Sequence, residues 1–290
     1  MATPFELIAA SKPFRILVGP DKKEFTIHTE LLSRMSKPLD TLVNGGMKEA
    51  EEGVAEWPEV DEGTFVRFWE FAYTGDYRVV DPVSDASTPL KSTNNNVNTP
   101  ENEYNDSQDY AEAPQDYAEA PQDYAEAPQE AEYKEDIWGM TRRVSSTPKD
   151  QMWQQFQNRF GTGQPAGQPN RDPLANYSKV LLSHACLYVF ADYYCVDALM
   201  ALCLRKLHRT LKVFDLHGGA RVPDVAQLID YSYKNTVDTA GGEPDGLRSM
   251  LATYAACKIE ELWGNAYFQD ILESGEVSKA IIGQLMKRLR

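Results

Sequence analysis

The sequence predicts an α+β fold, in which a small three-stranded sheet packed with helices is followed by an all-helical region. Near the N-terminus apolar residues alternate with polar ones, as in half-buried strands, whereas from about residue 177 they recur at helical spacing. Between these parts, residues 81–176 contain only eight Leu, Ile, Val or Phe. So few apolar side chains do not offset backbone ordering, which costs about 1–2 kcal/mol per residue, and this segment is predicted to be disordered.

The first folded part, residues 14–80, begins with a predicted β-hairpin. Apolar residues alternate on both sides of a turn sequence, Gly19-Pro20-Asp21; they are Phe14, Ile16, Val18, Phe25 and Ile27. Two short helices follow, the first marked by Leu31-Leu32 and the second by Leu39, Leu42 and Val43. Gly45-Gly46 is expected to end the second through a left-handed glycine. Residues 54–60 form the third strand, at a sheet edge because Pro58 cannot donate to a strand ladder.

One more helix completes this part. Asp61 is a suitable N-cap, and Gly75 closes the helix. Its predicted buried face consists of Phe65, Phe68, Trp69 and Ala72.

The predicted insertion is acidic and repetitive. Residues 81–176 contain seven basic and seventeen acidic residues, a net charge of −10. The sequence Asp-Tyr-Ala-Glu-Ala-Pro-Gln occurs three times, at 109–115, 116–122 and 123–129. The proline in every copy would break a helix, so the seven-residue period indicates an extended low-complexity segment and not a coiled coil.

The last part, residues 177–290, is predicted to be helical throughout. Two stripes at helical spacing are expected to face the core: Leu182, Cys186, Val189 and Tyr193, then Val196, Leu199, Cys203 and Leu207. Further helices are expected near residues 223–229, 247–262 and 277–289, separated by glycine and proline.

Charge and composition exclude several classes of function. The 290 residues carry 29 Lys and Arg against 44 Asp and Glu, a net charge of −15, which argues against nucleic acid or an anionic membrane as the main partner. No apolar run is long enough to predict a membrane span, and residues 1–13 do not resemble a secretory signal. We therefore expect a protein of the cytoplasm or nucleus with free, buried thiols at its four cysteines: Cys186, Cys195, Cys203 and Cys257.

Several strings occur in an order that is typical of one known domain. They are Phe25-Thr26-Ile27-His28 with Leu31-Leu32 and Ser36, then Gly45-Gly46-Met47-Lys48-Glu49, then Phe71 to Tyr77, and finally His184 to Tyr194. In this order the chain resembles a BTB/POZ domain. The resemblance implies a BTB/POZ fold made from residues 14–80 and 177–208, with residues 81–176 inserted in a surface connection, where added length costs little. Residues 209–290 then form a helical C-terminal region, as in many fungal-type and kelch-type BTB proteins.

The resemblance also implies a protein partner. In BTB adaptors of cullin-RING ubiquitin ligases, a hydrophobic–any–Glu triplet contacts the cullin, and Met47-Lys48-Glu49 has this pattern at the matching place. The alternative is that these residues simply build the connection. BTB domains also form swapped dimers through a long N-terminal leader, and the short leader, residues 1–13, disfavours this arrangement here. A self-associating scaffold without a ligase link therefore remains the second interpretation.

Two features of the insertion are further candidates. Ser145 follows Arg142-Arg143 and Thr147 precedes a proline, so both are candidate phosphorylation sites. An anchor motif, Met152, Trp153, Phe156 and Phe160, has the spacing of a helix that binds in a groove. The alternative for this motif is a tether that folds back on its own chain.

Catalytic and metal chemistry find no support in the sequence. His184 and Cys186 are two residues apart and face different directions on a helix, and neither a CxxC nor an HxxxH pair occurs. No serine lies in a nucleophile turn and no glycine loop could hold a phosphate. We therefore expect no catalytic residues, no metal and no cofactor; an enzyme that uses Cys and His of the helical part is the rival interpretation.

Overall fold

The computed structural model describes residues 4–82, 133–135, 141–143, 147–161, 167–239 and 241–288. One compact unit joins the residues up to Asp85 with those from Thr147 on, and residues 86–146 form a second. The fold is α+β, with a three-stranded mixed sheet and many helices, as predicted. The residues described from 209 on belong to the same compact unit as the sheet.

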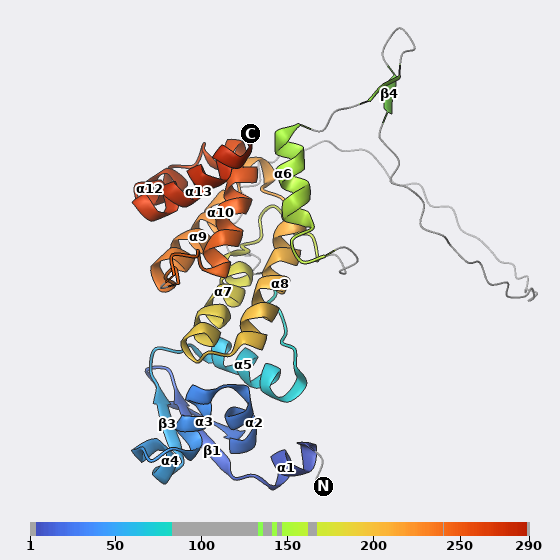
Figure 1. Ribbon diagram of the computed structural model, residues 1–290. Coiled ribbons are helices and arrows are strands. Elements are labelled where there is room, and N and C mark those ends of the chain that lie inside the picture. Colours follow the sequence, from blue (N-terminus) through green and yellow to red (C-terminus); the bar gives the residue numbers. More distant parts are fainter. Residues whose placement is uncertain are drawn as a thin grey trace, which may run out of the picture. The chain divides into compact units, whose positions relative to one another are not determined.

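The sheet is a hairpin with one added parallel strand (Figure 1). Strand β1 (Pro13–Val18) pairs antiparallel with β2 (Lys23–His28) and parallel with β3 (Val54–Trp57), in the order β2-β1-β3. Ile16 lies opposite Phe25 on one side and Ala55 on the other. Both the hairpin and the edge position of β3 are confirmed, but β3 ends at Trp57, before Pro58, and not at residue 60 as predicted.

Short helices surround the sheet. They are α1 (Pro4–Ala10), α2 (Thr29–Met35), α3 (Lys37–Asn44), α4 (Lys48–Glu52) and α5 (Glu62–Thr74). Asp61 caps α5 by accepting from the Thr64 backbone N–H, and Gly75 ends it in the left-handed region with φ of 77°, as predicted. Gly45 ends α3 differently from the prediction, because its φ is −74° and not left-handed. Glycine is required there by space, since an added Cβ would lie 2.3 Å from the Thr41 carbonyl oxygen.

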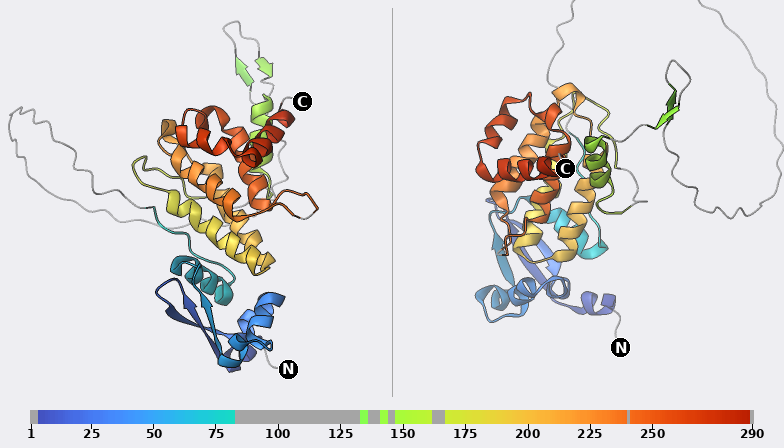
Figure 2. Two further views of the ribbon diagram at one scale, coloured as in Figure 1. Left: turned by 90° about the vertical axis from the view of Figure 1, so that its left-hand side faces the viewer. Right: turned by 45° about the horizontal axis from the view of Figure 1, so that its top comes forward.

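From residue 178 on, the described residues contain seven α-helices. They are α7 (Ser178–Tyr193), α8 (Asp197–Val213), α9 (Val222–Asn235), α10 (Gly246–Cys257), α11 (Ile259–Leu262), α12 (Ala266–Leu272) and α13 (Gly275–Arg288), with a short 3-10 turn, η1 (His217–Gly219). Helix α7 packs against α5, α8 and α9, which makes it the centre of the unit (Figures 1 and 2).

Of the two apolar stripes predicted to face the core, the one on α8 does so and the one on α7 does not. Leu199, Cys203 and Leu207 of α8 are buried, as expected. The stripe predicted for α7 is wrong, because Leu182, Cys186 and Val189 are only half-buried and Tyr193 is 77% exposed. Helix α7 is apolar on nearly every side, so periodicity could not identify its buried face.

Part of the region predicted to be disordered is folded. Helix α6 (Pro148–Gln157) buries Met152 and Phe156 and packs against α10 and α13. Its N-terminus carries a capping box between Thr147 and Asp150, which satisfies backbone N–H groups that have no partner inside the helix. A two-stranded hairpin, β4 (Tyr133–Glu135) with β5 (Thr141–Arg143), belongs to the other unit. The three repeats lie outside the described residues.

Candidate functional site

The triplet that the sequence singled out lies at the start of a one-turn helix and not in a plain connection. Met47 is the N-cap residue of α4 and is 61% exposed, while Glu49 is half-buried in the first turn. Lys48 pairs with Glu52 at 3.6 Å. Within the residues that the structure describes, Glu49 has no ion-pair partner, so its carboxylate is available beside an exposed methionine.

A second surface feature was missed by sequence reasoning. A groove of about 470 Å³ lies between the β3–α5 connection, the C-terminal end of α7 and helix α9. Trp57 forms its floor together with Tyr194, and their ring centroids are 4.9 Å apart. We call this feature the aromatic groove; its aromatic lining is Trp57, Phe190, Tyr193, Tyr194 and Tyr231.

The apolar stripe predicted for α7 is the sequence feature from which this groove could have been found. Cys186, Val189 and Tyr193 recur at helical spacing and were expected to face the core, yet all three line the groove. An apolar stripe predicts that one face of a helix is shielded from water. It does not tell whether the protein's own core or a binding partner shields that face.

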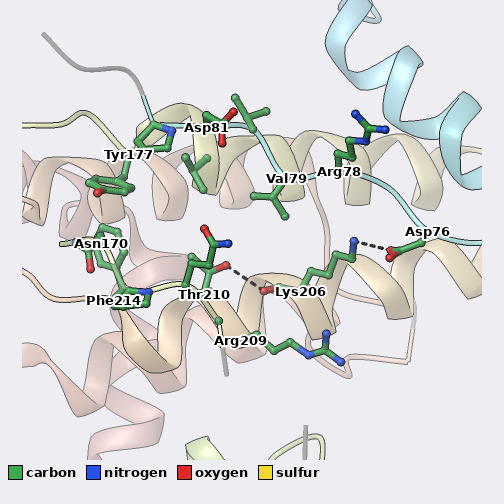
Figure 3. Close-up of a pocket in the computed structure, with 16 residues that line it drawn as sticks. Asp76, Arg78, Val79, Asp81, Asn170, Tyr177, Lys206, Arg209, Thr210 and Phe214 are labelled. Atoms are coloured by element: carbon green, nitrogen blue, oxygen red, sulfur yellow. Dashed lines mark hydrogen bonds and ion pairs between the residues drawn. The ribbon is translucent and has the colours of Figure 1, made fainter. Parts of the chain in front are cut away.

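A larger cavity, of about 600 Å³, lies where residues 76–82 and 167–170 pass over α7 and α8 (Figure 3). Its cations already have partners. Lys206 pairs with Asp76 at 2.5 Å and also donates to the Tyr77 carbonyl oxygen, and Arg78 pairs with Glu70 at 3.2 Å. These contacts hold residues 76–78 against α5 and α8, so we assign them a structural role.

A buried histidine lies beneath this segment. His184 is fully buried, and its Nδ1 atom shares a hydrogen bond of 2.7 Å with the Tyr77 hydroxyl. Burial, with Lys206 and Arg67 nearby, lowers the pKa of His184 to about 3, so the imidazole is neutral at physiological pH. Burial raises the pKa of the Cys203 thiol, which lies beside Tyr77, to about 12. A thiol that is held in its protonated form is the opposite of an activated nucleophile.

The cysteines differ in exposure. Cys203 and Cys257 are buried and Cys186 is half-buried, but Cys195 is exposed, which corrects the prediction of four buried thiols. Cys195 lies in the turn between α7 and α8 with a left-handed φ of 54°. No group of three His, Cys, Asp or Glu side chains able to hold a metal ion occurs among the described residues.

The candidate anchor motif packs within the chain itself. The Phe156 ring lies 4.8 Å from that of His208 and 5.6 Å from that of Tyr254, while Trp153 stacks on Phe156 at 5.3 Å. Met152 is buried, and Phe160 lies 5.0 Å from His208 between ring centroids. Of the two alternatives for this motif, the structure therefore shows the tether that folds back.

The two candidate phosphorylation sites differ in what the structure describes. Thr147 is exposed, and its hydroxyl donates to Asp150 Oδ2 at 2.6 Å and accepts from the Asp150 backbone N–H at 3.2 Å. The hydroxyl and the backbone N–H of Thr147 both donate to the Asp150 carboxylate, and these two bonds lower the pKa of Asp150. A phosphate on Thr147 would replace the donor and stand beside a carboxylate. Ser145 lies outside the described residues.

Comparison with known proteins yields no relative: the chain matches no protein-family model, no curated protein and no solved structure. Across the described part of the chain, none of the helices combines the length and apolar character needed to cross a membrane.

Proposed function

We propose that this chain is a BTB/POZ-type protein-interaction module that acts as a substrate adaptor of a cullin-RING ubiquitin ligase. The observation that carries the proposal is Met47, which is 61% exposed at the N-terminus of α4. Glu49 lies two residues further along the same helical turn, with no ion-pair partner among the residues described. In this proposal the two side chains contact the cullin together.

The chemistry of the pair supports this role. A methionine side chain is flexible and polarisable, so it fills a shallow apolar pocket on a partner at little cost. A carboxylate two residues away fixes the register of binding through charge and rejects partners with acidic surfaces. An exposed methionine and a carboxylate without an ion pair do little to stabilise α4, whereas both can contribute to an interface with a partner.

The order of elements supports the same proposal. A β1–β2 hairpin, the α2–α3 pair, the edge strand β3, helix α5 and then the α7–α8 pair follow the order that the BTB/POZ resemblance implies. A protein of this kind has no catalytic residues, metal or cofactor, and works in the cytoplasm or nucleus.

A self-associating scaffold is the second candidate, and one observation favours it. Helix α1 leaves Phe5 77% exposed and Leu7 44% exposed, so this helix carries apolar surface that a second copy would bury. The concentration dependence of molar mass, measured by sedimentation for the chain and for Phe5→Ser, separates this candidate from the adaptor.

Calorimetric binding to a purified cullin N-terminal region tests the adaptor proposal. We expect micromolar or tighter binding by the chain, and its loss in the double variant Met47→Asp, Glu49→Lys. Glu51→Lys is the matched control, because it reverses a charge on the same helix outside the triplet. A folded chain that does not bind any cullin region, or a double variant that binds as well as the control, overturns the proposal.

A further inference from the structure

We propose that the aromatic groove is a docking site for a basic peptide segment of a partner protein, in which a lysine or arginine is flanked by apolar residues. This site is separate from Met47 and Glu49, so the inference goes beyond the adaptor function and does not depend on it. It rests on the apolar floor of the groove and on the charge of its rim.

The floor is built from aromatic side chains whose rings pack tilted or edge-on against one another. The ring centroids of Trp57 and Phe190 are 5.3 Å apart, and those of Phe190 and Tyr194 are 4.8 Å apart. Tyr193 stands at the edge with 77% of its surface exposed, 4.9 Å from Tyr194. Aromatic faces carry negative charge in their quadrupole, so this floor attracts cations as well as apolar groups.

The rim is acidic, and no cation balances it within the lining. Three carboxylates line the groove, from Glu56, Glu59 and Asp61, and no lysine or arginine does. Lys22 pairs with Glu56 at 2.9 Å from outside the lining. Among the described residues, Glu59 and Asp61 are the two lining carboxylates that form no ion pair.

Asp61 also caps helix α5, and its carboxylate keeps its negative charge in doing so. Its carboxylate accepts hydrogen bonds from the Thr64 backbone N–H at 2.9 Å and from the Thr64 hydroxyl at 2.5 Å. These bonds cap α5 and fix the position of the carboxylate at the groove. A charge held in place by the fold attracts a cation without first losing side-chain entropy.

Size and charge together select the partner. A volume of about 470 Å³ accommodates a few side chains of an extended peptide and not a whole helix or domain. Apolar side chains of the peptide would cover the Tyr193 and Tyr194 rings while a cation reaches Glu59 and Asp61. Acidic segments are rejected by the same carboxylates.

Fluorescence anisotropy with three matched peptides tests this proposal on the full chain. The probe is a capped, labelled peptide in which two lysines alternate with leucine and phenylalanine. The comparison peptides carry glutamine or glutamate in place of the lysines. At about 0.1 M salt, where charges interact over about 10 Å, we expect saturable binding of the lysine peptide and at least tenfold weaker binding of the other two.

Variants then place the peptide in the groove. Glu59→Gln removes an exposed charge, and Asp61→Asn removes the other charge while keeping an N-cap residue. We expect each to weaken binding several-fold, Tyr193→Ala to weaken it further, and Glu51→Gln on α4 to have no effect. The proposal is overturned if the lysine peptide does not saturate, if the glutamine peptide binds equally well, or if the groove variants bind like the control. If the chain binds the lysine peptide but no cullin region, only the adaptor function is contradicted.

Discussion

The Tyr77 hydroxyl and the His184 imidazole share a buried hydrogen bond of 2.7 Å, although 107 residues separate them in the chain. Tyr77 is also held by Lys206, whose ammonium lies 4.2 Å from the centroid of the tyrosine ring. This contact fastens the end of the first folded part to α7 and α8, immediately before the segment that the sequence predicts to be inserted.

Removing the tyrosine hydroxyl is expected to destabilise the fold. In Tyr77→Phe the Nδ1 atom of His184 loses its partner in a buried site, which costs about 1–3 kcal/mol. Urea unfolding measures the change. Tyr73→Phe is the matched control, because its hydroxyl lies 2.7 Å from His28 Nδ1 at a half-buried site where water can replace it. Equal losses in the two variants would contradict a special role for the Tyr77–His184 bond.

Stability is expected to fall on mild acidification. The pKa of His184 is lowered from 6.5 to about 3 in the fold, so between these values the unfolded chain binds a proton that the folded chain does not. The free energy of unfolding therefore decreases as the pH drops below 6.5, by about 1.4 kcal/mol from this residue at about pH 5.5. The lowered pKa of His208 acts in the same direction.

Urea unfolding at about pH 7.5 and pH 5.5 checks this dependence. In that window few carboxylates change their charge, so the histidines dominate the slope. An unfolding free energy that is unchanged between the two pH values would mean that His184 is protonated in the folded state or exposed to water.

Truncation of Phe156 tests whether α6 contributes to the fold. Phe156 is 1% exposed, and Phe156→Ala is expected to cost about 3–5 kcal/mol, as for other phenylalanines in cores. Gln155→Ala is the control, because the neighbouring side chain is exposed on the same helix. A Phe156→Ala variant as stable as the control would show that α6 is only loosely attached.

One thiol is expected to react much faster than the other three. Cys195 is exposed, whereas burial raises the pKa of Cys186, of Cys203 to about 12 and of Cys257 to about 11. A thiol-specific chromophore should therefore label the native chain in one fast step that Cys195→Ser abolishes. Since exposure explains such reactivity, a fast step at Cys195 is no sign of a catalytic cysteine. A fast step that survives in Cys195→Ser would revive the enzyme interpretation.

Local features of the fold could be predicted from sequence because their causes are local. The β1–β2 hairpin follows from alternation around a turn, and the bounds of α5 follow from its cap at Asp61 and its left-handed Gly75. The exposure of Met47 could not be predicted in the same way. It depends on α4 forming one turn at the surface, where the sequence indicated only a connection.

By itself the sequence determined the α+β class, the three strands and the positions of the long helices, since short-range periodicity and capping residues encode them. Only the tertiary structure decided that α6 is folded, because its buried side chains gain their partners from helices far along the chain. The Phe156 ring, for example, lies 4.8 Å from the ring of His208 on α8 and 5.6 Å from that of Tyr254 on α10. The tertiary structure also decided which side of α7 faces solvent, because α5, α8 and α9 together cover the rest of an almost wholly apolar helix. The aromatic groove exists as a consequence of that packing.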